Sequence, residues 1–216
     1  METRRLPVRV TGVLCLDFVN TVEPRASTRP GEYLVDPDVL VDWAADAGAV
    51  DEELAAGIHA WVGGHRELAE RELAGLLARR EALYRVLLAT LPTPGSPGPA
   101  PPEVQAAGDR DRRLVAGWVA AARRHAVLVP GRPRWRWEWP AEATLRRAWW
   151  PVAESAGELL AGRGVDHLGV CDNPGCGWLY LDTTKNHSRR WCSMELCGNA
   201  AKSRRHAARS RAARGG

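Results

Sequence analysis

Four of the five cysteines in this 216-residue chain lie between positions 171 and 197, in two pairs of identical spacing. The pattern is Cys171-x4-Cys176-x15-Cys192-x4-Cys197. A zinc ion takes four ligands in a tetrahedron, and two short loops that each carry two thiolates supply them without strain. The residues between the first two cysteines, Asp172-Asn173-Pro174-Gly175, favour a turn that lets both sulfur atoms point inward. The spacing therefore predicts a structural zinc ion held by these four cysteines.

Other chemistries of clustered cysteines fit this pattern less well. The first residues contain arginines and a short apolar patch interrupted by Asp17, without a small-residue cleavage site, so we expect no signal peptide and a cytoplasmic protein. A reducing compartment disfavours disulfides. Redox catalysis prefers a two-residue spacing, and a catalytic zinc ion keeps an open position that four thiolates would close. Iron held by four thiolates remains an alternative, and His187 could in principle replace one cysteine.

The charge of the chain is distributed unevenly. The net charge is +4, but the segment from Asp182 to the end holds nine Lys or Arg and two acids, a charge of +7, which leaves −3 for the rest. The basic residues closest to the cysteines precede the second pair or follow it on an Ala-rich segment with helical propensity: Lys185, Arg189, Arg190, Lys202, Arg204 and Arg205. Because such an arrangement favours DNA through counterion release, we expect these six residues to bind DNA. A solubilising tail is the simpler alternative.

The first 165 residues predict a domain with a core of its own, since 45% of the chain is apolar. The stretch 8–21 is apolar on both faces and predicts a strand. Helices are expected after Asp36-Pro37, after Asp51, over 65–91, around 114–122 and over 143–161, the last one interrupted or kinked at Pro151. The Pro- and Gly-rich stretch 92–102 predicts a loop, and the lone Cys15 a small buried hydrophobe.

The segment 125–140 predicts a β-hairpin, in which Trp135, Trp137 and Trp139 alternate with charged residues. We interpret these tryptophans as a cover for a core packed with helices rather than as a ligand platform. The predicted fold is therefore α+β: a mostly helical domain over 1–165, with a small antiparallel sheet made from the N-terminal strand and the hairpin. A zinc module over 166–216 follows and ends in a basic helix.

Several motifs resemble a known family. Trp178-x-Tyr180-x-Asp182-Thr183, Ser188-Arg189-Arg190-Trp191-Cys192-Ser193-Met194, Cys197-Gly198-Asn199 and Lys202 are similar to the CGNR-type zinc finger, which ends bacterial proteins described as stress-induced transcriptional regulators. The stretch Leu14-Cys15-Leu16-Asp17-Phe18-Val19-Asn20-Thr21 resembles the start of the ABATE domain, which precedes this finger in the same family. One departure is that Ala200 stands where the family has its final arginine.

The resemblance implies a zinc-dependent DNA-binding transcriptional regulator whose upstream domain senses a small-molecule effector. Asp17, Asn20 and Arg25 are the polar residues nearest the shared N-terminal motif and are candidates for ligand binding. The alternative role of Asp17 and Asn20 is to cap the strand end and hold adjacent turns. A zinc module that binds protein or RNA is the alternative function. We expect no enzyme, because no nucleophile–base pair or phosphate loop is evident, and no membrane span, because no apolar run approaches roughly 18 residues.

Overall fold

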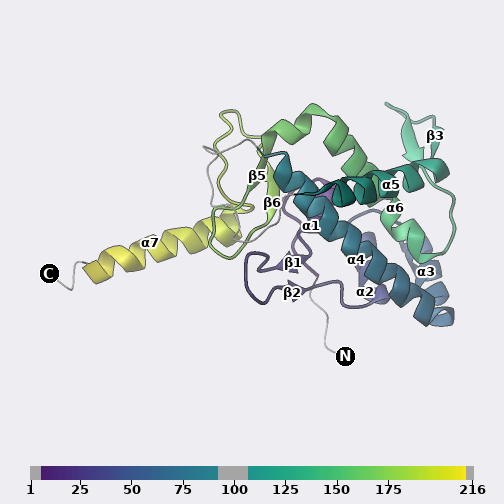
Figure 1. Ribbon diagram of the computed structural model, residues 1–216, viewed down its shortest axis with the longest axis horizontal. Coiled ribbons are helices and arrows are strands. Elements are labelled where there is room, and N and C mark those ends of the chain that lie inside the picture. Colours follow the sequence, from purple (N-terminus) through teal and green to yellow (C-terminus); the bar gives the residue numbers. More distant parts are fainter. Residues whose placement is uncertain (1–5, 92–106, 213–216) are drawn as a thin grey trace.

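The computed structural model describes residues 6–91 and 107–212, and this part of the chain is mostly helical (Figure 1). The Pro- and Gly-rich loop predicted at 92–102 lies outside the described residues. The α-helices are α1 (Leu14–Val19), α2 (Pro37–Asp46), α3 (Glu52–Gly64), α4 (Arg66–Ala89), α5 (Asp109–His125), α6 (Leu145–Ala161) and α7 (Asn199–Ala212). A 3-10 helix, η1 (Arg163–His167), and a π-helical turn, η2 (Met194–Gly198), complete the helical elements of the described residues.

Six short strands pair into three separate two-stranded antiparallel sheets within the described residues. They are β1 (Val22–Glu23) with β2 (Gly31–Glu32), β3 (Val127–Val129) with β4 (Arg136–Glu138), and β5 (Leu168–Val170) with β6 (Leu179–Leu181). The predicted sheet between an N-terminal strand and the hairpin was wrong, since the hairpin strands β3 and β4 pair only with each other among these residues.

The predicted N-terminal strand is instead the helix α1. Thr11 and Gly12 form a turn in which Gly12 has a φ of +69°, a conformation that glycine adopts without strain. Asp17, one turn into the helix, accepts hydrogen bonds from the N–H groups of Val10 (3.2 Å) and Thr11 (3.1 Å). Cys15 through Val19 are all buried, and four of these five residues are apolar, so apolar side chains point to several sides of α1. A helix that is buried on all sides has the same apolar run as a buried strand, and its periodicity cannot separate the two.

The predicted helices over the first ninety residues are confirmed, and their caps explain where they begin. The Asp36 side chain accepts a hydrogen bond from the Val39 N–H, and Pro37 occupies the first helical position of α2. Asp51 caps α3 in the same way through the Leu54 N–H. The predicted interruption at Pro151 was wrong, since α6 continues through this residue as one helix.

One large apolar core fills the space between α1 and the helices around it. Helix α1 packs against α6 and α4. The Phe18 ring lies 5.6 Å from Trp43 and 6.1 Å from Trp118, centroid to centroid. Cys15 is fully buried here, as expected, and burial raises the pKa of its thiol to about 12. Its thiol is therefore neutral and packs as an apolar group.

The tryptophans of the hairpin depart from the prediction that they cover the core. Trp139 is half-buried and donates a hydrogen bond from Nε1 to the Ala122 carbonyl oxygen (3.0 Å). Trp135 and Trp137 are 63% and 43% exposed, respectively. The reason is that β3 and β4 form an isolated ribbon at the edge of the molecule. Of the three tryptophans, only Trp139 is close enough to the helices to pack against them. In Figure 1 this hairpin lies at the end opposite α7, which projects away from the body.

Candidate zinc centre and basic surface

The two pairs of cysteines are presented by two different local structures. Cys171 follows β5 directly, and a turn closed by the hydrogen bond from the Cys176 N–H to the Asn173 carbonyl oxygen (3.0 Å) brings Cys176 back beside it. Cys192 and Cys197 are brought together by η2, where the Ser193 carbonyl oxygen accepts from the Cys197 N–H (3.1 Å). Both pairs are thus positioned by short turns, as the spacing predicted.

The geometry of the four sulfur atoms fits a tetrahedral metal site. All four cysteines are buried, and their Sγ atoms lie within 4.8 Å of one another. The Sγ of Cys192 is 3.8 Å from that of Cys176 and 3.6 Å from that of Cys197. Four thiolates about 2.3 Å from a zinc ion at tetrahedral angles lie about 3.8 Å apart. The sulfur atoms are therefore spaced as a structural zinc ion requires, with no position left open for a substrate.

The polar surroundings of the cluster favour the thiolate form of one of its members, Cys197. Hydrogen bonds from Cys171, Cys176 and Cys192 lower the pKa of the Cys197 thiol. The Asn173 side chain adds a hydrogen bond of 3.1 Å from Nδ2 to the Cys197 Sγ. Such a contact to a ligand atom holds the ligand in place and stabilises its negative charge. The sequence analysis identified Asn173 only as a turn residue, and its role toward the sulfur atom was missed.

The loop between the cysteine pairs is organised by Asp182, which follows β6. Its carboxylate accepts hydrogen bonds from the Thr184 N–H and hydroxyl (2.9 and 2.6 Å) and from the Arg189 N–H (2.7 Å). Burial acts to raise the pKa of Asp182, but these hydrogen bonds outweigh it and leave the pKa lowered. His187 is exposed on this loop, where its ring stacks on His167 at a centroid distance of 4.1 Å.

Arg189, predicted to contact DNA, has a different place in the structure. Its guanidinium group donates to the carbonyl oxygens of Trp191 (3.0 Å), Leu181 (3.0 Å), Val10 (3.3 Å) and Cys192. It also lies 4.8 Å from the centre of the Tyr180 ring. With four of its five N–H donors used on backbone carbonyls, Arg189 holds the finger together.

The other basic residues predicted to bind DNA lie on the surface. Arg190 is exposed and donates from Nε to Asp172 (2.6 Å), and Arg204 donates to the Asn173 side-chain oxygen (2.5 Å). Lys185, Lys202 and Arg205 are exposed. Arg190 and Arg204 are thus attached to the turn between the first two cysteines, which places positive charge directly beside the metal site.

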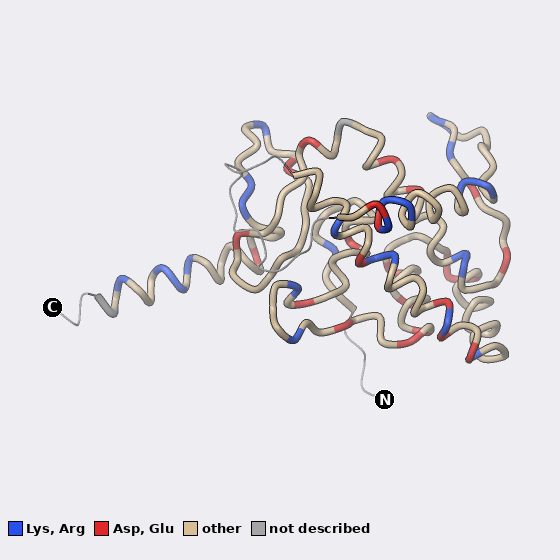
Figure 2. Tube along the Cα trace, viewed as in Figure 1, with Lys and Arg blue, Asp and Glu red and all other residues tan. Residues whose placement is uncertain are grey.

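The C-terminal helix α7 carries most of this charge. Residues 202–209 are all exposed, and the helix carries Lys202, Arg204, Arg205, Arg209 and Arg211 without an acidic residue. Figure 2 shows the cations up to Arg209 along a helix that extends beyond the rest of the molecule. Ala200, which stands in place of the family arginine, is half-buried in the first turn.

The three candidate ligand-binding residues of the N-terminal motif lie at the junction with the finger or beside it. Asn20 forms two hydrogen bonds with the backbone of Leu179 in β6: its Nδ2 donates to the carbonyl oxygen, and its Oδ1 accepts from the N–H, both at 2.9 Å. Arg25 pairs with Glu81 (2.7 Å) and stacks on the Tyr84 ring. Asp17 holds the turn before α1, as described above. The structure thus gives all three residues protein partners.

Backbone contacts tighten this junction further. The N–H groups of Arg25 and Ala26 donate to the carbonyl oxygens of Cys176 (2.9 Å) and Gly175 (3.0 Å). Gly177 has a φ of +68°, and a Cβ atom there would lie only 3.1 Å from the Ala26 nitrogen. The Tyr84 hydroxyl donates to the Gly177 carbonyl oxygen (2.7 Å), and the Trp178 Nε1 donates to Val22 (2.8 Å). The loop of the first cysteine pair is therefore bonded directly to the helical domain.

These contacts were not predicted from the sequence. Their partners lie up to 159 positions apart, as for Asn20 and Leu179, and many of them are backbone groups that carry no residue-specific signal.

Among the helices of the described residues, none combines the length and the apolar character that a membrane span requires.

A mostly helical domain joined to a finger with one structural zinc site defines this chain as a zinc-finger protein. The family model for the CGNR zinc finger matches residues 167–210, which include all four cysteines. The model for the ABATE domain, described as "Putative stress-induced transcription regulator", matches residues 12–163. Because this second match covers more than half of the chain, the chain belongs to the ABATE family. Both predicted resemblances are thereby confirmed. A comparison with curated proteins finds no match.

Proposed function

We propose that this zinc-binding protein is a cytoplasmic DNA-binding transcription regulator, in which the finger and α7 contact DNA and the helical domain responds to an effector. The observation that carries the proposal is α7, which is exposed along 202–209, projects beyond the body and carries cations without acids. Lys202, Arg205 and Arg209 follow the spacing i, i+3, i+7, which gathers side chains on one face of a helix. A stripe of this kind favours phosphate contacts in a groove.

The zinc site supports this use of α7 because it fixes where the helix begins. Cys197 lies in η2, immediately before α7, and Arg204 is bonded to Asn173, which in turn is bonded to the Cys197 sulfur atom. Cations that are held in place lose less conformational entropy on binding than free ones. The finger therefore fixes the orientation of the basic stripe formed by Lys202, Arg205 and Arg209.

The test is a fluorescence-anisotropy titration of duplex DNA with the zinc-loaded full chain at several salt concentrations. We expect affinity to fall steeply with salt. Arg205→Ala should weaken binding by about 1 kcal/mol and lower the salt slope by about one unit. The matched control is Arg71→Ala, which removes an exposed cation from α4 in the helical domain. Equal losses from both substitutions, or tighter binding of single-stranded RNA than of duplex DNA, would contradict the proposal.

A second substitution tests the departure from the family. Ala200 lies one turn before Arg204 on α7, so an arginine at position 200 would extend the row that Arg204 begins. If this row contacts DNA, Ala200→Arg should strengthen binding by about 1 kcal/mol. An unchanged affinity would indicate that the family arginine acts inside the finger and that the Arg204 face of α7 points away from DNA.

A further inference from the structure

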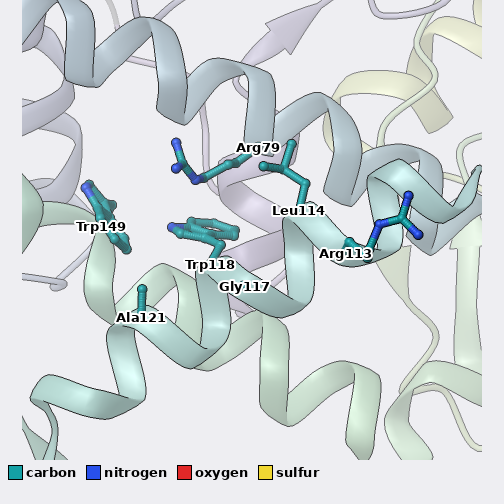
Figure 3. Close-up of a pocket in the computed structure, with 7 residues that line it drawn as sticks. All are labelled: Arg79, Arg113, Leu114, Gly117, Trp118, Ala121 and Trp149. Atoms are coloured by element: carbon teal, nitrogen blue, oxygen red, sulfur yellow. The ribbon is translucent and has the colours of Figure 1, made fainter.

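A pocket of about 180 Å³ opens between α4, α5 and α6 of the helical domain (Figure 3). Its lining includes Arg79 from α4, Leu114, Trp118 and Ala121 from α5, and Trp149 from α6. An apolar cavity of about 150 Å³ in a protein core can hold a benzene molecule. The pocket is therefore of the size that accepts one ring with a small substituent.

The side walls of the pocket suit an apolar ring. The rings of Trp118 and Trp149 lie 5.9 Å apart, centroid to centroid, with an angle of 42° between their planes. Leu114 and Ala121 border the same space from α5. Indole surfaces in such a tilted arrangement leave edges and faces that an additional aromatic ring can contact favourably.

A buried donor without a protein partner faces this space. Trp118 is only 2% exposed, and its Nε1 has no hydrogen-bond partner among the described residues. Figure 3 shows this nitrogen directed toward the gap between Arg79 and Trp149. An indole N–H can only donate, and leaving a buried donor unpaired costs free energy. A ligand with an acceptor group would recover that cost.

Arg79 supplies positive charge beside this donor. One of its guanidinium nitrogens donates to the Gly75 carbonyl oxygen (2.8 Å), but no carboxylate pairs with it among the described residues. Its neighbours on α4 differ, since Arg80 pairs with Glu32 (2.5 Å) and Arg85 with Asp111 (2.7 Å). In Figure 3 the Arg79 guanidinium lies on the same side as the Trp118 nitrogen, whereas the guanidinium of Arg113, at the rim, points away.

We propose that this pocket binds a small carboxylate that carries a single apolar ring. The ring packs against the free edges and faces of the two indoles, and the carboxylate accepts hydrogen bonds from the Trp118 Nε1–H and the Arg79 guanidinium. The residues that line the pocket include no Asp or Glu that would repel an anion. As the effector site of the regulator, the pocket rests on the proposed function; as a binding site, it stands on its own geometry.

The position of the pocket also connects a bound ligand with the finger through α4. Arg79 precedes Arg80, Glu81 and Tyr84 on α4, and these three residues bond to β2, to Arg25 and to the loop of the first cysteine pair. A ligand that is bonded to Arg79 therefore contacts the same helix, α4, that holds the loop of the first cysteine pair.

The experiment uses the zinc-loaded full chain without DNA and benzoate as the probe. We expect isothermal titration calorimetry to detect benzoate binding and benzamide, its neutral counterpart, to bind at least tenfold more weakly, because a charged acceptor makes the stronger hydrogen bond. The indole N–H resonance of Trp118, assigned from the Trp118→Phe spectrum, should shift on addition of benzoate. No shift and no heat at millimolar benzoate, or equal affinity for benzamide, would overturn the proposal.

Variants locate the site. Trp118→Phe removes the donor and keeps a ring, and Arg79→Gln removes the charge; each should weaken benzoate binding about tenfold or more. Ala121→Leu should fill the pocket and abolish binding. The matched control is Arg113→Gln, whose guanidinium points away and whose loss should change affinity less than twofold. Equal losses from Arg79→Gln and Arg113→Gln would place the ligand elsewhere.

The two titrations separate this proposal from the proposed function. If benzoate fails to bind while duplex DNA binds as expected, only the pocket proposal is wrong. If benzoate binds while duplex DNA does not, the pocket is a binding site and the proposed function as a DNA-binding regulator is wrong.

Discussion

The helical domain has one large apolar core, to which the finger adds Leu168, Val170 and Leu179 from β5 and β6, whereas the finger's own buried cluster consists of four cysteines, Trp178 and Tyr180. Only Val10 and Trp191 pack against that second cluster as half-buried apolar residues. So few apolar side chains cannot offset the conformational entropy of ordering some forty residues. The metal therefore does in the finger what hydrophobic burial does in the helical domain, and the two regions should respond to different perturbations.

Loss of a zinc ligand is expected to produce the largest difference in stability between the two regions. Cys192→Ser should abolish zinc binding and unfold the finger, because structural zinc contributes about 10–16 kcal/mol of folding free energy in zinc-finger peptides. The helical domain should keep most of its helix. Elemental analysis for zinc and hydrogen exchange along the chain measure both effects. Cys15→Ser is the control, since it changes a buried cysteine of the helical core and should leave one zinc per chain. A variant at position 192 that retains its zinc would contradict the assignment.

A core substitution should give the opposite pattern. Leu16 is fully buried in α1, and Leu16→Ala should lower the free energy of unfolding of the helical domain by about 2–5 kcal/mol while the zinc content stays at one. Urea denaturation of the zinc-loaded protein measures the change. Leu68, exposed on α4, provides the control, because Leu68→Ala should cost less than about 0.5 kcal/mol. Similar costs for both substitutions would mean that α1 does not lie in the centre of the core.

The junction between the regions can be tested at Asn20. Asn20→Ala leaves the buried N–H and carbonyl groups of Leu179 without their partners, at a cost of about 2–4 kcal/mol for the two groups. We expect faster hydrogen exchange in the segment 175–181, with zinc retained. Asn186→Ala removes an exposed asparagine of the finger loop and should leave exchange in this segment unchanged. Unchanged exchange in the Asn20 variant would show that the finger is held without this contact.

The smallest effect concerns pH. Burial acts to raise the pKa of Glu81, but the hydrogen bonds and charges of Arg25 and Arg80 outweigh it and leave the pKa lowered. A lowered pKa means that the carboxylate contributes stability above its unfolded-state value, near 4.5, and loses it as the pH falls through the lower folded-state value. Since more than a third of the Glu81 side chain is exposed, the contribution should be about 1 kcal/mol or less.

The measurement for this prediction is the difference in unfolding free energy between the wild type and Glu81→Gln from pH 7 to pH 3. The difference should shrink as the pH falls below 4.5, and release of zinc at low pH is common to both proteins and cancels. Glu70→Gln, which removes an exposed pair with Arg66, should differ from the wild type by less than Glu81→Gln at pH 7. A difference for Glu81→Gln that grows on acidification would reverse the sign of the argument.

The sequence predicted those parts of the molecule that local rules determine. The spacing of the cysteines identified all four ligands, and capping residues such as Asp36 and Asp51 located the starts of α2 and α3. Helix α1 was mistaken for a strand because its neighbours bury every face, which removes the helical period from the pattern. Trp135 and Trp137 were assigned to the core because alternation predicts a face but does not show what covers it.

The candidate site was predictable only in part, for a related reason. A basic residue in a sequence has no visible partner, so Arg189 and Arg190 looked equivalent. In the structure, Arg189 donates to backbone carbonyls, while Arg190 stays at the surface beside Asp172. Likewise, Arg79, Trp118 and Trp149 meet only because α4, α5 and α6 pack together. Contacts of this kind depend on tertiary geometry and leave no local signal.

The bonds between Gly177 and Tyr84 and between Leu179 and Asn20 also limit how such a finger can be recombined. A segment that begins at residue 166 carries all of its zinc ligands but leaves behind the side chains that complete its first loop. A chimera that transplants this segment onto an unrelated protein would still bind zinc, yet the direction of α7 relative to the new host would no longer be fixed. A portable version of the finger would therefore need an asparagine and a tyrosine from its original host, grafted at matching positions on the recipient surface.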